Sequence, residues 1–151
     1  MSAFTIRPER PGDAASIRAL TQAAFRDMPF SDGDEADLVD RLRTSGDLAL
    51  SLVAEDADRI VGHVALSPVT ISDGSMHWLG LGPVSVWPEL HGQRIGSALM
   101  KRAIADIREM GAMGIVLLGD PAYYARFGFE HDPRLAYPGP PPEYFQRLVL
   151  E

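Results

Sequence analysis

The sequence predicts an α/β fold of the α+β kind, in which a mixed, mostly antiparallel sheet carries helices on both faces. Three strand-like stretches separated by turns fill residues 48–86, which is typical of antiparallel strands. Apolar side chains then recur every four residues over 95–107, and an all-apolar run follows at 115–118. A strand–helix–strand unit of this kind predicts one right-handed parallel crossover inside the sheet.

The N-terminal third is expected to form one short strand and two helices. Residues 4–7 alternate like a strand, which the sequence Pro-Gly-Asp at 11–13 ends. A helix follows up to Pro29, and a shorter helix fits residues 34–43. The apolar side chains of the first helix that fall on one face are Ile17, Leu20, Ala24 and Phe25.

Strands fill the middle of the chain and return near its end. The strands expected before the crossover are residues 48–54, 59–66 and 76–86. The first two of them form a hairpin around a turn at 55–58. The elements expected after the crossover are a short helix at 121–126, a strand that begins at Phe129 and an edge strand at 144–150.

Length and composition indicate one domain over residues 1–151 and argue against several classes of protein. The net charge of −7 argues against nucleic acid, whose phosphates attract basic surfaces. The chain has no cysteine and no cluster of histidines, so we expect no metal site. No apolar run reaches the roughly 18 residues that span a membrane, and the first residues do not read as a signal peptide. We therefore expect a cytoplasmic protein without a membrane partner.

The most informative segment connects the third long strand to the helix at 95–107. The apolar run ends at Pro88, a short polar loop with Gly92 follows, and then the amphipathic helix begins. A loop at a helix N-terminus collects unpaired backbone N–H groups and the positive end of the helix dipole, which suits an anion such as phosphate. An ordinary strand-to-helix connection is the alternative interpretation.

A second informative segment follows the strand at 115–118. Residues 119–129 read Gly-Asp-Pro-Ala-Tyr-Tyr-Ala-Arg-Phe-Gly-Phe. Together with the loop and the hairpin element Arg-Ile-Val-Gly-His at 59–63, this string resembles the GNAT superfamily of acetyl-CoA-dependent N-acetyltransferases, and in particular a bacterial subgroup of predicted N-acetyltransferases. The resemblance covers nearly the whole chain and is strongest over residues 48–129.

The resemblance implies a GNAT fold with a coenzyme A site at the loop. The family's motif, Val-x-Pro followed by Gln/Arg-Gly-x-Gly-x-Gly/Ala, registers on Val86 and Pro88, so this chain has His91 in place of Gln/Arg and Arg94 in place of a glycine. A frame that starts at Gln93 fits only a short form of the motif. The residues implied to bind the coenzyme are Val84, Ser85, Val86, His91, Gly92, Gln93, Arg94, Ile95, Gly96, Ser97 and Tyr124.

Each part of this site has an implied task. The N–H groups of residues 92–97 would cradle the pyrophosphate, and an outward Arg94 side chain could itself meet a phosphate, although a positive φ at this arginine would be unfavourable. Residues 84–86 would splay from the parallel strand at 115–118 and hold pantetheine in the gap. An N–H near Val86 would then polarise the acetyl carbonyl.

Tyr124 precedes Gly128 by the family's spacing and is implied to protonate the leaving thiolate of coenzyme A. Tyr123 is the competing aromatic, and a packing role is the alternative for Tyr124. The asparagine that the family often places before this tyrosine is absent, and Asp120 and Pro121 occupy its neighbourhood.

The group that takes the proton from the amine is less defined. No carboxylate lies on residues 76–86, where His77 is the only obvious base, and His63 is expected on the sheet surface. Glu35 is a candidate carboxylate for contact with the substrate, with helix capping as the alternative. The acidic residues between 27 and 40 are either a solvated helix face or a rim that attracts a cationic amine.

The function implied is transfer of acetyl from acetyl-CoA to a primary amine of a small molecule or peptide, by direct attack in a ternary complex. A non-catalytic acyl-CoA-binding or sensor module of the same fold is the alternative. A nucleotide-binding domain of another class is a third hypothesis, which lacks the Gly-Lys-Ser/Thr of a P-loop. A homodimer is one expected state, because dimers are common for this fold.

Overall fold

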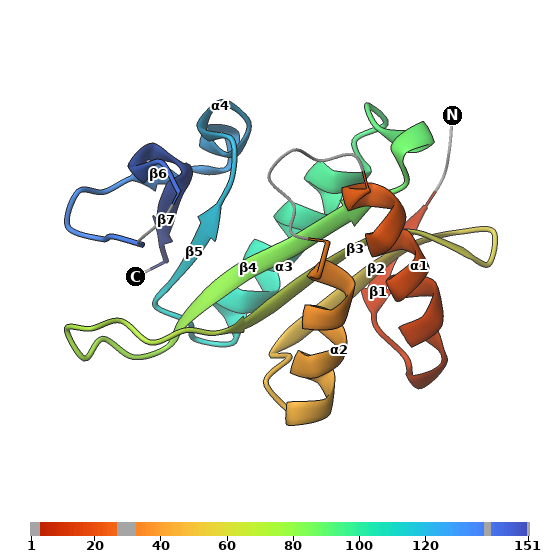
Figure 1. Ribbon diagram of the computed structural model, residues 1–151, viewed down its shortest axis with the longest axis horizontal. Coiled ribbons are helices and arrows are strands. Elements are labelled where there is room, and N and C mark those ends of the chain that lie inside the picture. The colour runs from red at the N-terminus through yellow and green to blue at the C-terminus, as the bar shows by residue number, and fades with distance from the viewer. Residues whose placement is uncertain (1–3, 27–32, 138–139, 151) are drawn as a thin grey trace.

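A computed structural model describes residues 4–26, 33–137 and 140–150, which form one seven-stranded sheet in the order β1-β2-β3-β4-β5-β7-β6 (Figure 1). Its strands are β1 (Thr5–Pro8), β2 (Leu50–Asp56), β3 (Arg59–Pro68), β4 (Trp78–Val86), β5 (Gly114–Leu118), β6 (Glu130–His131) and β7 (Phe145–Val149). Its helices are α1 (Ala14–Phe25), α2 (Glu35–Ser45), α3 (Ile95–Glu109) and α4 (Pro121–Tyr124). All pairings are antiparallel except that of β4 with β5, which confirms the predicted crossover.

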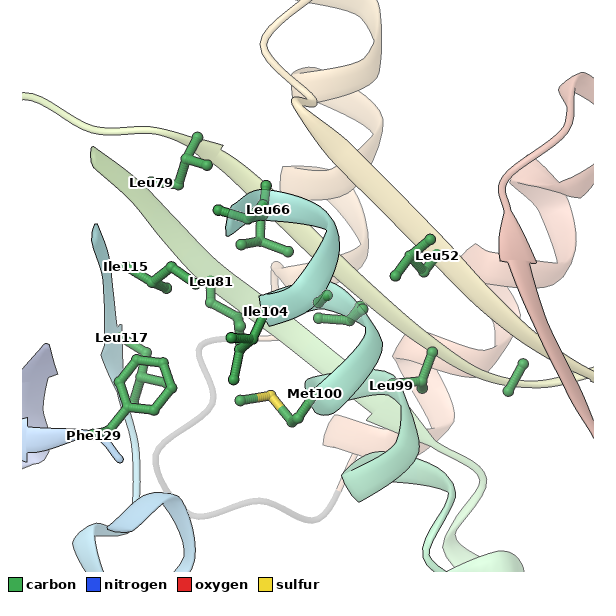
Figure 2. Packing of buried hydrophobic residues seen from close by; sticks show 14 of the residues in the cluster. Leu52, Leu66, Leu79, Leu81, Leu99, Met100, Ile104, Ile115, Leu117 and Phe129 are labelled. Carbon is green, nitrogen blue, oxygen red and sulfur yellow. The ribbon is translucent and has the colours of Figure 1, made fainter. Parts of the chain in front are cut away.

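Helices cover both faces of the sheet, as predicted: α1 and α2 lie on one side and α3 on the other (Figure 1). Alternate side chains of β2 separate into two cores, because successive side chains of a strand point to opposite faces. Leu52 joins the cluster around α3, whereas Val53 joins the cluster of Ile17 and Leu20 under α1. Figure 2 shows the larger cluster, in which α3 packs on side chains from β3, β4 and β5.

A β-bulge in β4 determines which side chains face α3. The register with β3 shifts between the pairs Val64–Val84 and Leu66–Leu81, so β4 contains one extra residue. Leu79 and Leu81 before the shift, and Val84 and Val86 after it, therefore all pack against the α3 core although their numbering changes parity. The bulge therefore keeps the side chains at the end of β4 in contact with the α3 core, although the backbone changes direction there.

The parallel pair β4–β5 is short. Its ladder runs only from Trp78–Gly114 to Gly80–Val116, although β4 continues to Val86 and β5 to Leu118. The two strands diverge toward α3 and α4 (Figure 1). This confirms the expected splay between residues 84–86 and the strand at 115–118.

Three expectations from the sequence are wrong in detail. The C-terminal strand is not at the edge, because β7 pairs with both β5 and the two-residue strand β6, which is the edge instead. The strand expected from residue 76 begins at Trp78, since His77 adopts a positive φ of 67°. His63 is fully buried rather than on the surface, because α1 and α2 cover its face of the sheet.

No helix among the described residues is both long and apolar enough to cross a membrane.

Candidate active site

In the described part of the chain, the last residues of β4 have no strand partner on the side that faces β5. The N–H of Trp87 donates to the carbonyl of Val61 at 3.4 Å, so it points toward β3. Hydrogen-bonding groups alternate between the two edges of an antiparallel strand, which turns those of Val84 and Val86 toward β5. Within the described ranges, no strand pairs with that edge beyond Gly80. The N–H groups of Val84 and Val86 therefore point to the side of β4 that faces β5.

The loop after β4 is fixed at both of its ends. The indole of Trp87 donates to the carbonyl of Ile60 at 3.0 Å, and a single 3₁₀ turn spans Pro88–Leu90. Nε2 of His91 lies 3.1 Å from the carbonyl oxygen of Val86. A carbonyl can only accept, so the ring donates from Nε2. In place of the family's Gln/Arg, His91 thus ties the loop back to the end of β4.

Two residues of the loop adopt left-handed backbone conformations, Gly92 with φ 87° and Arg94 with φ 66°. Both are positions at which the family's motif has glycine. Arg94 therefore keeps the backbone path of the motif without its glycine, at a cost of about 1–2 kcal/mol for a residue with a Cβ. The unfavourable conformation named from the sequence is present, and the arginine side chain is exposed.

The loop delivers three N–H donors to one point. The first backbone bond of α3 runs from the N–H of Ala98 to the carbonyl of Arg94 at 3.0 Å. The N–H groups of Ile95, Gly96 and Ser97 precede this bond and have no acceptor within the helix. They lie at the positive end of a 15-residue helix, which makes the position suitable for an anion.

Tyr124 lies on α4, immediately after β5. Its ring occupies the space that a Cβ on Gly119 would fill, and it packs edge-on against Phe129 with ring centroids 6.2 Å apart. Burial, with smaller contributions from Tyr123 and Asp120, raises the pKa of the Tyr124 phenol to about 12. The hydroxyl is therefore protonated, and able to donate, throughout the neutral range.

Asp120 and Pro121, which stand near the family's usual asparagine, build the start of α4. The carboxylate of Asp120 accepts from the N–H of Ala122 at 2.9 Å, and Pro121 occupies the first helical position. These two residues set the direction of a four-residue helix and hence of both tyrosines. The side chain of Tyr124 packs on Gly119, whereas that of Tyr123 reaches α3, where its hydroxyl oxygen lies 3.4 Å from the position of a Cβ on Gly96.

Glu35 is half-buried on the first turn of α2, in the layer that covers the face opposite α3. Part of the acidic group around it is neutralised, because Arg18 forms ion pairs of 2.8 Å with Asp37 and 2.7 Å with Asp40. This pairing favours the solvated-face interpretation for Asp37 and Asp40. Asp27 and Asp32 of the same group lie outside the described residues.

The sequence did not predict a partly buried polar chain that runs from His63 to Arg43 of α2. Nε2 of His63 lies 2.8 Å from Oγ of Ser51, which donates to Glu9 at 2.6 Å, and Glu9 is held by Nε and Nη2 of Arg43 at 2.7 and 2.8 Å. The nearly all-apolar run around His63 in β3 is the sequence signal that could have indicated its burial. Among the described residues no group of histidines and carboxylates could hold a metal ion, and His77 is exposed.

Comparison of the sequence with known proteins agrees with the resemblance. A family model described as an acetyltransferase (GNAT) domain matches residues 5–131. The N-acetyltransferase YhbS of Escherichia coli K12 is 41% identical over 139 residues, which are 89% of this chain and 80% of the relative.

Solved structures of similar proteins share the fold over the full chain. A GNAT family acetyltransferase from Brucella melitensis, in complex with acetyl-CoA, has a TM-score of 0.86 and 46% identity, with 99% of this chain and 89% of that chain covered. YhbS from Escherichia coli, in complex with CoA, has a TM-score of 0.88 and 37% identity, with 100% of this chain and 83% of that chain covered. The protein therefore belongs to the GNAT family of acetyltransferases.

Proposed function

We propose that the protein transfers an acetyl group from acetyl-CoA to a primary amine in a ternary complex. The observations that support this proposal are that β4 has no strand partner among the described residues on its β5 side beyond Gly80, that the first turn of α3 follows this strand end, and that the partly buried Tyr124 follows β5, the strand that diverges from β4. Two similar proteins were solved with acetyl-CoA or CoA, which supports the choice of co-substrate.

The coenzyme would be bound by backbone and loop. The N–H groups of residues 92–97 would donate to the pyrophosphate oxygens, with His91 holding the loop and Arg94 adding positive charge beside it. Pantetheine would lie along residues 84–86 as an additional strand would. Gln93 and Ser85 belong to the same segments, but the side chain of Ser85 is buried toward α1, so this residue would contribute backbone only.

The chain's own groups can serve each stage of acyl transfer. An N–H of Val84 or Val86 on the free edge would donate to the carbonyl oxygen as negative charge develops on it. Tyr124 would donate its proton to the sulfur when the carbon–sulfur bond breaks, and burial keeps that proton on the phenol until then. The thioester supplies the activated acetyl group. A cationic amine would lose one proton to become nucleophilic and a second when the amide forms; one of the two restores the Tyr124 phenol and the other leaves to solvent, through Glu35 or water.

Glu35 would serve the acceptor rather than the coenzyme. Its layer, α1 and α2, covers the face opposite α3, whereas Tyr124 packs with the core on the α3 side. An amine would thus reach the acetyl carbon from the α1–α2 side of the sheet, and the thiolate would leave on the α3 side, toward Tyr124. A carboxylate at the entrance suits a cationic amine.

Binding is tested first by calorimetry with acetyl-CoA, for which no heat at high micromolar concentration would contradict the proposal. Turnover is then tested by thiol release against a library of primary amines. Tyr124→Phe should keep the affinity for acetyl-CoA and lower kcat by roughly 10²-fold or more. Tyr137→Phe is the matched control, since Tyr137 is exposed and stacks on Phe145. Equal rates for wild type and Tyr124→Phe would remove Tyr124 from the mechanism.

A non-catalytic acyl-CoA-binding module is a second candidate. The observation that favours it is the strained Arg94 at a glycine position, together with the absence of any carboxylate on β4. Tight acetyl-CoA binding without thiol release across the whole amine library would support this candidate over the enzyme.

A further inference from the structure

Tyr123 crosses from α4 to the first turn of α3. Its hydroxyl oxygen lies 3.4 Å from the position of a Cβ on Gly96, and Cγ2 of Val86 lies 3.9 Å from the same position. The hydroxyl is therefore at the junction between the end of β4 and the N-terminus of α3. The Tyr123 side chain therefore links α4, which follows β5, to the first turn of α3.

The ring of Tyr123 is held in this position by its neighbours. It packs edge-on against Tyr124 with centroids 4.9 Å apart and against Phe127 with centroids 5.6 Å apart. The guanidinium carbon of Arg126 lies 4.5 Å from the ring centroid. Contacts on several sides restrict the side chain, so little rotational freedom is lost when its hydroxyl binds a ligand.

The surroundings of the hydroxyl suit a phosphate oxygen. The first-turn N–H groups of α3, including that of Gly96, have no acceptor within the helix. A neutral phenol adds one more donor to such a set, and donation to an anionic oxygen is stronger than donation to a neutral one. The hydroxyl lies against the first turn of α3, since a Cβ on Gly96 would be 3.4 Å from its oxygen.

We propose that Tyr123 is a coenzyme-binding residue, whose hydroxyl donates a hydrogen bond to the phosphate of coenzyme A that lies on the first turn of α3. The adjacent tyrosines then have separate tasks, Tyr123 on the α3 side for binding and Tyr124 on the β5 side for proton donation. This inference rests on the proposed function, because it requires the loop to hold the pyrophosphate.

Tyr123→Phe tests the proposal, since it removes the hydroxyl and retains the ring that packs on Tyr124 and Arg126. We expect a roughly tenfold weaker affinity for acetyl-CoA in calorimetry, as for the loss of a hydrogen bond to a charged group. We expect no change in the affinity for S-acetylpantetheine, which lacks the phosphates, and a smaller effect on kcat at saturating acetyl-CoA than on the affinity for acetyl-CoA. Tyr137→Phe, an exposed tyrosine elsewhere, should bind both ligands as the wild type does.

Several results would overturn the assignment. One is an affinity of Tyr123→Phe for acetyl-CoA within twofold of the wild type. Another is an equal loss for acetyl-CoA and S-acetylpantetheine, which would show that the change acts through packing. A third is a lower kcat with unchanged affinity, which would place Tyr123 in the chemistry. Tight binding by wild type and variant alike contradicts only this inference, whereas a wild type that binds no acetyl-CoA contradicts the proposed function itself.

A second variant provides an independent check. A methyl group in Gly96→Ala would lie about 3.4 Å from the hydroxyl oxygen, in van der Waals contact with it. We expect Gly96→Ala and Tyr123→Phe to be non-additive in their effects on acetyl-CoA affinity, because both changes alter the same contact. Fully additive losses would contradict the proposed contact.

Discussion

Acidification should destabilise this protein through one buried histidine. His63 is enclosed between the sheet and the α1–α2 layer, and burial lowers its pKa from 6.5 to about 4. The single hydrogen of the Ser51 hydroxyl goes to Glu9, so Ser51 accepts from Nε2 of His63, and the other ring nitrogen carries only a lone pair. That Nδ1 has no hydrogen-bond partner, so a proton placed there would be buried without an acceptor.

The direction and size of this effect on the free energy of unfolding follow from the linkage between protonation and unfolding. An unfolded histidine takes up a proton as the pH falls through 6.5, whereas the folded one stays neutral until about 4. Unfolding therefore binds a proton in this window, and the free energy of unfolding falls as the pH is lowered. The full shift corresponds to about 3 kcal/mol, of which about 2 kcal/mol is lost between pH 7.5 and pH 5.

Urea unfolding of the wild type and of His63→Gln at several pH values between 7.5 and 5 measures this loss. Glutamine can still donate to Ser51 but does not titrate, so the variant should lose about 2 kcal/mol less than the wild type over this range. His77→Gln, at an exposed histidine, should behave as the wild type does. Parallel losses in wild type and His63→Gln would refute the reasoning, because carboxylates common to both would then account for the whole pH dependence.

Three further substitutions probe the site and its support. Arg94→Gly should raise the free energy of unfolding by up to about 1 kcal/mol, because glycine adopts the observed φ without strain, and a less stable variant would contradict this strain. Calorimetry should also show weaker acetyl-CoA binding, because the variant loses the guanidinium beside the proposed phosphate site. Gly119→Ala should lower kcat and destabilise the fold by about 1–3 kcal/mol, since the new methyl group meets the ring of Tyr124, and an unchanged melting temperature and rate would show that the ring moves freely. Leu99→Ala should cost about 2–5 kcal/mol in urea unfolding, because Leu99 is fully buried between α3 and the sheet, whereas Leu38→Ala, at an exposed position, should cost far less.

Local patterns predicted most elements because each element buries one regular face. The four-residue repeat of Ile95, Leu99, Ala103 and Ile107 lies in the α3 core as a single stripe. The all-apolar run at 115–118 became β5, whose side chains are buried up to Leu117. The diverging strands were implied by the family resemblance, and their short ladder confirms them.

Features that depend on the partner across a strand or a helix were not predictable from local patterns. The position of β7 inside the sheet depends on the two-residue β6, which is too short to show a period. The burial of His63 depends on the helices packed over it, which the nearly all-apolar run of β3 does not identify. The contact between Tyr123 and Gly96 joins residues 27 positions apart and depends on the divergence of β4 and β5, so only the structure shows it.

The brevity of the β4–β5 ladder has a mechanical consequence. Three paired positions join the part of the sheet formed by β1 to β4 to the part formed by β5, β7 and β6, and α3 and α4 supply the remaining connection. A ligand that binds between β4 and β5 with strand-like hydrogen bonds would add a connection between these two parts of the sheet. A ligand that binds only the folded state adds its binding free energy to the stability of the protein, so bound acetyl-CoA would stabilise the whole sheet. Amide hydrogen exchange in β5 and β7 should therefore slow when acetyl-CoA is saturating, although these strands include residues that do not touch it.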